Sequence, residues 1–398
     1  MKTRWVIPIV AVTACASTET LFQGPPDDSI GVPEPPESDA GLEAAPVEAE
    51  ARPCSDCEYF PDICSPDVLC LDGPFDENIP GGRLDPQTTI SVIRGRSNSD
   101  VWAIGALGAV AHFDGAAWTR SDLGSRDSLI ALWLRDGGEV AFGYPGRVYT
   151  RGLGVVDAGA GISAGGWSLN VPTIPDALAD AYLRAQLGSS WGMPGANWFW
   201  TTSIGHPSPV TGLWRMRQLP SNLFEAAAGI PTEACRINQC LNLKGIHGAS
   251  ADELWAVGVS GSAVLVTGAD GDTPSVKAFN AQTLDTLNGV WVASTSDAWA
   301  VGAGGMVRHY KGDPVLWDVV SDVPTRGNLR AIWGSSSTDI WAVGDAALVL
   351  HYDGNSWSRI KIAGLGMRRP NLTTVWVAAP GHVWIGGEGV ILSLGGKP

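Results

Sequence analysis

One stretch near the C-terminus, Leu329 to Ile360 (LRAIWGSSSTDIWAVGDAALVLHYDGNSWSRI), constrains the fold more than any other feature of the chain. It contains four short apolar runs separated by Ser, Thr, Asp, Gly and Asn, a pattern typical of strands joined by turns. The second run, Ile340 to Val343, is apolar at every position, so this strand must be covered on both faces. A four-stranded sheet between two similar sheets has that cover, and radial repetition supplies such neighbours.

Copies of this unit recur upstream and once downstream. Successive copies begin 39 to 60 residues apart, with the leading apolar residues Ile90, Leu129, Leu183, Leu243, Leu287, Leu329 and Leu372. Seven units of this period predict an all-β fold over residues 85–398, a seven-bladed β-propeller of four-stranded antiparallel blades. The high counts of Gly (50) and Trp (18) suit short strands and tight turns.

Two tryptophan positions recur in these units. The first, at the end of strand one, holds Trp133, Trp291, Trp333 and Trp376, and we assign Arg94, Leu187 and His247 to it in the other units. The second, in strand two, holds Trp102, Trp255, Trp299, Trp341 and Trp384. Recurrence favours packing, as it does for His112, His309 and His351 in strand three. The tryptophans of blade three that depart from the repeat are the better binding candidates: Trp191, Trp198, Trp200 and Trp214.

The Asp-Gly-x-x-Trp turn, at Asp114 to Trp118 and again at Asp353 to Trp357, carries a family resemblance. Together with the WAVG strands it resembles the WAVG…HYDGxxW repeat propellers of exported bacterial proteins, particularly of myxobacteria. It is also distantly similar to the Asp-box turns of sialidase-type propellers. The resemblance covers residues 88–398 and implies the fold. It does not imply one function, because propellers serve many.

The last unit ends after its third strand, Val390 to Leu394. An open ring would leave an unpaired sheet edge. We therefore predict that the disulfide-rich segment 53–84 supplies the missing outer strand. The expected position lies between Leu71 and Leu84, shortly after the sequence LDGPF, which echoes the Asp-Gly-x-x-Trp turn.

The N-terminus predicts export. Lys2 and Arg4 precede an apolar run that ends at Ala14, too short for a membrane-spanning helix, so residues 1–15 indicate a signal peptide. The sequence VTAC resembles a bacterial lipoprotein box, which implies cleavage before Cys15, a lipid on Cys15, and a place at the outer membrane, cell surface or periplasm. Ordinary signal cleavage after Ala16 is the open alternative.

Residues 16–52 are rich in Pro, Glu and Asp and poor in large apolar residues, which predicts a disordered tether. Of the net charge of −15, the segment from Ala16 to Leu84 contributes −14, with 16 acidic residues against Arg52 and Arg83. The repeat region is therefore nearly neutral, and we expect no nucleic-acid surface.

Four cysteines follow the tether with the spacing C-x2-C-x6-C-x5-C. Such a set could bind zinc in a cytosolic protein, but behind an export signal it favours two disulfides whose connectivity stays open. The four are Cys54, Cys57, Cys64 and Cys70. A third bridge is expected between Cys235 and Cys240.

Function is expected where blades two and three break the pattern. The insertions Pro172–Tyr182, Ser203–Thr211 and Leu219–Leu241 should crowd one face, and His206 lies in the second of them. The chain has no H-E-x-x-H, G-x-S-x-G or phosphate-loop motif. We therefore expect a non-catalytic module without cofactor or metal, a monomer or a subunit of a larger assembly, that binds an envelope protein or a glycan. The alternative is a sialidase-like or other hydrolase that uses the propeller channel. A cluster of Arg, Asp and Glu at the channel mouth would favour this alternative. A purely structural envelope lipoprotein is a third possibility.

Overall fold

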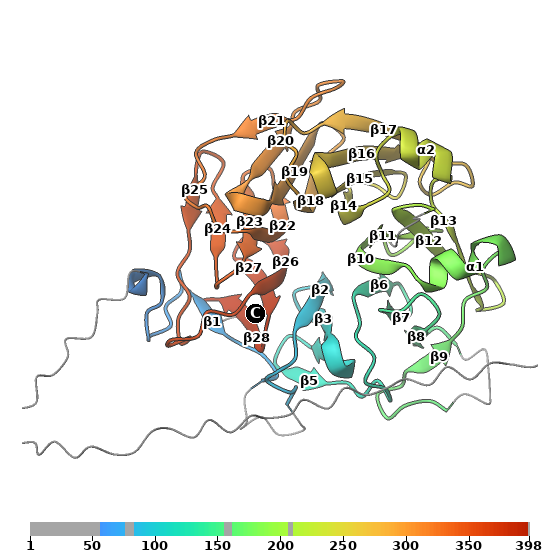
Figure 1. Ribbon diagram of the computed structural model, residues 1–398. Coiled ribbons are helices and arrows are strands. Elements are labelled where there is room, and N and C mark those ends of the chain that lie inside the picture. The colour runs from blue at the N-terminus through green and yellow to red at the C-terminus, as the bar shows by residue number, and fades with distance from the viewer. Residues whose placement is uncertain (1–55, 76–82, 155–160, 206–209, 397–398) are drawn as a thin grey trace, which may run out of the picture. The chain divides into compact units, whose positions relative to one another are not determined.

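The computed structural model of the chain describes residues 56–75, 83–154, 161–205 and 210–396. The described residues form seven four-stranded antiparallel sheets around a central axis (Figure 1), which confirms the predicted seven-bladed β-propeller. The first strand of every blade contacts the first strands of both neighbouring blades, so the ring is closed. The predicted signal peptide and tether, with Cys15 and Cys54, lie outside the described residues.

Six blades are continuous in sequence, and their strands run outward from the axis in chain order. Blades one to three consist of β2 (Ile90–Ser97), β3 (Asp100–Gly105), β4 (Val110–Phe113) and β5 (Trp118–Arg120); β6 (Ala131–Arg135), β7 (Gly138–Phe142), β8 (Val148–Arg151) and β9 (Ser168–Asn170); and β10 (Gln186–Trp191), β11 (Phe199–Ile204), β12 (Leu213–Gln218) and β13 (Phe224–Ala228). Blades four to six consist of β14 (Leu243–Gly248), β15 (Glu253–Gly258), β16 (Ser262–Thr267) and β17 (Ser275–Asn280); β18 (Leu287–Ser294), β19 (Asp297–Gly302), β20 (Val307–Tyr310) and β21 (Asp318–Val320); and β22 (Leu329–Ser336), β23 (Asp339–Gly344), β24 (Val349–Tyr352) and β25 (Trp357–Arg359).

The seventh blade joins the two ends of the ring. Its inner strands β26 (Leu372–Ala379), β27 (His382–Gly387) and β28 (Val390–Leu394) come from the C-terminal part of the chain, and its outer strand is β1 (Leu69–Leu71). Within β1, Leu69 is fully buried, and Leu71 pairs with Leu392. The closing strand thus ends at Leu71, the first residue of LDGPF, whereas we expected it after this sequence. The reason is apolar burial, because Val68, Leu69 and Cys70 are buried together.

Disulfides secure two places in the fold. Cys64 bonds to Cys70, which lies in the closing strand, and Cys235 bonds to Cys240 between blades three and four. Cys57 is disulfide-bonded as well. Such bonds indicate an oxidising compartment outside the cytoplasm. Among the described residues, no helix has the length and apolar character that a membrane crossing requires.

The recurring histidines have a shared structural role. His351 Nε2 donates to Asp339 Oδ1 over 2.8 Å, and Trp341 Nε1 donates to the same oxygen over 3.0 Å. Equivalent bonds join His112 and Trp102 to Asp100 in blade one. Blade five repeats them with His309, Trp299 and Asp297. The expected structural role of the three histidines agrees with this geometry.

The start of blade three differs from its predicted position. Leu183 ends a helix and is 62% exposed, and strand β10 begins only at Gln186. Trp191 pairs with Trp200, just as Trp291 pairs with Trp299, so Trp191 and not Leu187 holds the first tryptophan position. The cause is the starting residue, because β10 carries the same register shift as the first strands of five other blades. Leu187, and not Leu183, therefore holds the leading position that Leu287 holds in blade five. In blade two Val140 holds the second tryptophan position, opposite Trp133.

Candidate functional site

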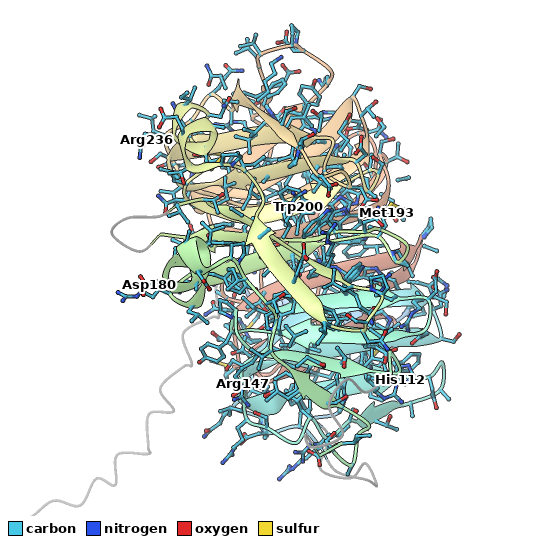
Figure 2. The ribbon with its side chains drawn as sticks, turned by 90° about the vertical axis from the view of Figure 1, so that its right-hand side faces the viewer. His112, Arg147, Asp180, Met193, Trp200 and Arg236 are labelled. Carbon is cyan, nitrogen blue, oxygen red and sulfur yellow. A yellow bond between two sulfur atoms is a disulfide. The ribbon has the colours of Figure 1, made fainter. Side chains whose placement is uncertain are left out.

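The two faces of the ring differ in what their loops carry. One face, the helix face, carries α1 (Asp176–Leu183) and α2 (Thr232–Ile237), which lie in the connections that lead into blades three and four. Figure 2 shows Asp180 of α1 and Arg236 of α2 along one edge of the ring, and His112 and Met193 along the opposite edge. The opposite face, the hairpin face, holds the turns between strands one and two and between strands three and four.

Only part of the expected insertions is loop. Pro172–Tyr182 contains most of α1. Leu219–Leu241 is not a single loop, because it includes β13, the outer strand of blade three, followed by α2. The link between β11 and β12 belongs to the helix face, but residues 206–209, with the candidate His206, lie outside the described residues.

Helix α1 forms for local reasons and packs by an apolar stripe. Pro175 precedes it, Asp176 lies in its first turn, and Asp180 pairs with Arg184 over 2.8 Å. Leu178, Ala181 and Tyr182 pack against blades two and three, at helical spacing. The ring of Tyr182 lies 5.0 Å from that of Trp214, centroid to centroid.

A pocket of about 310 Å³ lies between α1 and blade three, and we call it the α1 pocket. Its base is apolar and its outer rim carries Asp180 and Arg184. The lining residues come from α1 and its C-terminal end, and from the ends of β11 and β12: Ala177, Asp180, Ala181, Arg184, Ala185, Ser203, Ile204, Gly205, Val210, Thr211 and Trp214. Walls of small and apolar side chains with a charged rim are typical of a binding pocket.

Large apolar side chains are exposed on the helix face of blades two to four. They lie in its connections and include Tyr144 (56%), Val171 (71%), Leu183 (62%) and Ile237 (71%). Helix α2, which ends at Ile237, is held by the Cys235–Cys240 disulfide. Part of the helix face therefore offers apolar contacts on ordered elements.

The expectation of exposed tryptophans in blade three is wrong for three of the four. Trp198, Trp200 and Trp214 are 4%, 1% and 2% exposed. Trp198 stacks against Arg215 and Arg217, with the guanidinium carbons 4.1 and 4.5 Å from the ring centre, and Trp200 Nε1 donates to the carbonyl of Ala269 over 3.1 Å. These residues join blade three to blade four. Trp200 pairs with Trp191 and therefore holds the recurring second tryptophan position, and none of the three side chains faces solvent.

Trp191 is half-buried, and it lies at the axis of the ring. The seven equivalent positions of the innermost strands hold Arg94, Trp133, Trp191, His247, Trp291, Trp333 and Trp376. The ring of His247 lies 4.0 Å from Trp191 and 4.7 Å from Trp333, and the guanidinium of Arg94 lies 4.0 Å from the centre of the Trp333 ring. These side chains form an aromatic floor across part of the channel.

Above the floor lies a channel cavity of about 410 Å³, with Lys244 and Arg330 among the side chains of its upper wall. Burial lowers the pKa of Arg94 to about 9. Burial, together with the charge of Arg94, lowers the pKa of His247 well below its ordinary value, and the amide of Val292 donates to its Nδ1 over 3.1 Å. His247 is therefore neutral with its proton on Nε2, and Arg94 keeps its charge at neutral pH.

The channel gives little support to acid–base hydrolysis. Among the described residues, no Asp or Glu lines the channel cavity, and the mouth above it has Asp345 alone, which pairs with Arg330. General acid–base catalysis of glycoside cleavage uses a pair of carboxyl groups. In the described part of the chain, moreover, no group of three His, Cys, Asp or Glu side chains is placed to hold a metal.

No protein-family model and no curated protein matches the chain. Solved structures do match it. YCF48 from Cyanidioschyzon merolae superimposes with a TM-score of 0.58 at 13% identity, over 78% of this chain and 96% of that chain. YCF48 bound to D1 peptide gives 0.56 at 14% identity, over 84% and 96%. The WD40 propeller domain of Doa1 gives 0.52 at 10% identity, over 77% and 95%.

Identities this low show the propeller fold alone. The bound D1 peptide is a property of that YCF48 structure. The likeness to myxobacterial WAVG repeats remains a sequence resemblance, since no family model matches.

Proposed function

We propose that the chain is a non-catalytic binding module of the cell envelope, which takes a protein partner on the helix face of blades two to four. The observation that carries this proposal is the α1 pocket, on a face that also exposes large apolar side chains. An apolar pocket with a few polar groups at its rim is the usual form of a binding site.

A protein partner fits this surface better than a glycan. Sugar sites use the faces of exposed aromatic rings together with polar groups, but the tryptophans Trp198, Trp200 and Trp214 are buried. The α1 pocket is walled by Ala, Val, Ile and Trp, and its only charged pair is Asp180 with Arg184 at the rim. An apolar side chain of a partner would fill such a pocket and displace weakly held water. Glycan binding is thus the second outcome that the experiment must recognise.

We further propose that the module is exported and anchored by a lipid on Cys15. Its support is the resemblance of VTAC to a lipoprotein box and the disulfides, which need an oxidising compartment. Replacing Cys15 by Ala should move the protein from the membrane fraction to the soluble fraction of the envelope. If both the wild type and the Cys15→Ala variant stay with the membrane and neither carries a lipid, the proposed lipid anchor is wrong.

Site-specific cross-linking tests the partner surface. A photo-reactive amino acid at Tyr144, on the helix face, should give a discrete protein adduct in intact envelopes of the source organism. The double variant Ala181→Glu, Leu183→Asp should remove the adduct, because it places charge in the pocket wall and on its exposed apolar neighbour. The matched control is Ile162→Asp with Leu223→Asp, which alters two exposed apolar residues of the hairpin face.

Loss of the adduct in the helix-face variant alone supports the proposal. An adduct that survives there, or that disappears equally in the hairpin-face control, contradicts the placement of the site. If glycosidases remove the cross-linked species and it contains no second protein, the partner is a glycan and not a protein. Far-ultraviolet circular dichroism and melting of each variant separate loss of binding from loss of fold.

A further inference from the structure

We propose that the channel above the aromatic floor is a binding site for a carboxylate, with Arg94 as its principal anchor. The site is separate from the partner surface on α1, and its test uses small probes, so it does not depend on the proposed function. The argument rests on the cations of the channel, on what already pairs with them, and on the shape of the cavity.

Arg94 is the deepest cation in the channel. Its Nη1 donates to the carbonyl of Ile93 over 2.6 Å and lies 3.5 Å from that of Val375, while its plane stacks on Trp333. Within the described residues no carboxylate pairs with it. A guanidinium withdrawn from bulk water without a counter-charge is costly, and a bound anion would offset that cost. The contacts to Ile93 and Trp333 fix the fork in advance, so little freedom is lost on binding.

The second uncompensated cation is Lys244, in the cavity wall nearer the mouth. Its Nζ donates to the amide oxygen of Asn288 over 3.2 Å, a neutral partner that leaves its charge available. Asn288 in turn donates to the carbonyl of Leu329 over 2.8 Å, which fixes its orientation. Arg330 is different, because it already pairs with Asp345. The cavity therefore presents two positive charges at different depths.

The cavity fits a carboxylate on a narrow, partly apolar stem. Its walls alternate hydrogen-bonding and apolar groups: Ser91, Asn288 and Thr373 among the first, and Val92, Ile130, Ile246 and Ile332 among the second. A planar carboxylate matches the guanidinium fork of Arg94 in a bidentate pair. A polyphosphate fits poorly, because its several negative charges would meet only the two uncompensated cations Arg94 and Lys244.

Two sources share this chemistry: the C-terminus of a peptide and a small free acid. Isothermal titration calorimetry of the folded chain should therefore use trialanine with a free C-terminus, trialanine amide, butyrate and inorganic phosphate. We expect the free-acid peptide or butyrate to bind and the amide not to bind. Arg94→Gln should weaken the binding at least about tenfold, as expected when a buried charge pair loses one partner.

A stability measurement separates a binding role of Arg94 from a structural one. Because Arg94 lacks a counter-charge, Arg94→Gln should leave the melting temperature of the free protein unchanged or raise it. If that variant fails to fold, Lys244→Gln serves instead, with an expected loss of about threefold to tenfold in affinity. Arg326→Gln, an exposed cation outside the channel, is the matched control and should bind like the wild type.

Binding of trialanine, of butyrate or of both supports the inference. Trialanine alone would indicate a peptide C-terminus as the ligand, and butyrate alone would indicate a small free acid. Equal binding of the peptide acid and its amide contradicts it. So does preference for phosphate, absence of binding at tens of millimolar probe, or equal loss in the Arg326→Gln control. The double variant Ala181→Glu, Leu183→Asp should bind the probe normally, so failure of the partner surface and failure of the channel site are distinguishable.

Discussion

Blade six and blade seven have the same four-stranded plan but obtain their strands differently. Blade six is one continuous run, Leu329–Arg359, with its outer turn formed at Asp353 and Gly354. Blade seven takes its outer strand β1 from residues more than 300 positions earlier in the chain. Figure 1 shows the consequence, because β1 lies beside the C-terminal strand β28 at the junction of the ring.

The contacts around the second-strand tryptophan differ in the same way. In blade six His351 stands opposite Trp341, and both donate to Asp339. In blade seven Ser393 stands opposite Trp384, and its hydroxyl donates to Asp72 over 2.8 Å. The local network of the repeat is thus replaced by a bond that reaches the closing segment. Local contacts form each blade, whereas long-range contacts at blade seven hold the ring shut.

The largest effect should follow from removing the closing strand. A chain that begins at Arg83 lacks β1, so the edge of β28 is unpaired and the site of Leu69 is empty. Loss of a buried leucine alone costs about 2–5 kcal/mol, and the strand pairing adds to it, so we expect the free energy of unfolding to fall by more than about 5 kcal/mol. Chemical denaturation measures this against a chain that begins at Cys54. Equal stability of the two chains would mean that the ring holds without its closing strand.

The sequence allows local features to be predicted better than long-range ones. The third strand of the last unit, Val390–Leu394, has the predicted bounds, since a run of apolar residues between turns defines a strand locally. The need for a closing strand was also foreseeable, but its position was not. Leu69 occupies the closing position because it packs in a core with residues more than 270 positions away in the sequence.

The candidate site was harder to predict. Leu183 ends helix α1 and Leu187 holds the leading position of blade three, so the recurring Trp200 looked exceptional when the unit was counted from Leu183. The channel site had a signal in Arg94 and His247, which replace tryptophan in the repeat, but their proximity through Trp333 is a property of the closed ring. The α1 pocket needed the packing of a helix on two blades, which no local pattern encodes.

The next effect concerns the network specific to the regular blades. Asp339→Ala should lower the free energy of unfolding by about 3 kcal/mol, because His351 Nε2 and Trp341 Nε1 both lose their acceptor. Exposed Asp322→Ala is the control and should have almost no effect. A loss below about 0.5 kcal/mol would mean that water replaces the carboxylate.

The same carboxylate should make stability depend on pH. Burial acts to raise the pKa of Asp339, but hydrogen bonds from His351, Ser335 and Trp341 outweigh it and lower the pKa below 3.8. The unfolded chain therefore takes up the proton first as the pH falls. The stabilisation is complete above pH 3.8 and is lost below it, toward the lowered pKa. Denaturation curves between pH 6 and pH 2 should show a smaller acid-induced loss in Asp339→Ala than in the wild type.

A smaller effect is expected from the disulfide of the closing strand. Replacing Cys64 and Cys70 by Ser opens a loop with a sequence separation of 6 residues, which should cost about 2 kcal/mol in the chain-entropy account. The pair Cys235 and Cys240 has a separation of 5 and should cost about the same. A clearly larger loss at Cys64 and Cys70 would show that this bond holds the closure itself, and equal losses would show that it acts only on the unfolded chain. Addition of reductant should remove the difference in stability between the wild type and a variant that lacks both of these bonds.

The smallest effect should come from the outer turn, which blade six has and blade seven lacks. Gly354 has a φ of +94°, and an added Cβ would lie 2.9 Å from the side chain of Thr338. Gly304 in blade five has a φ of +64° and open space around the position of a Cβ. Replacing Gly304 by Ala thus adds only the cost of the left-handed backbone, about 1 kcal/mol, while the same change at Gly354 adds a steric term to it. In thermal melts, the melting temperature of Gly354→Ala should be lower than that of Gly304→Ala. The reverse order would mean that the outer turn of blade six accommodates an added Cβ without a steric cost.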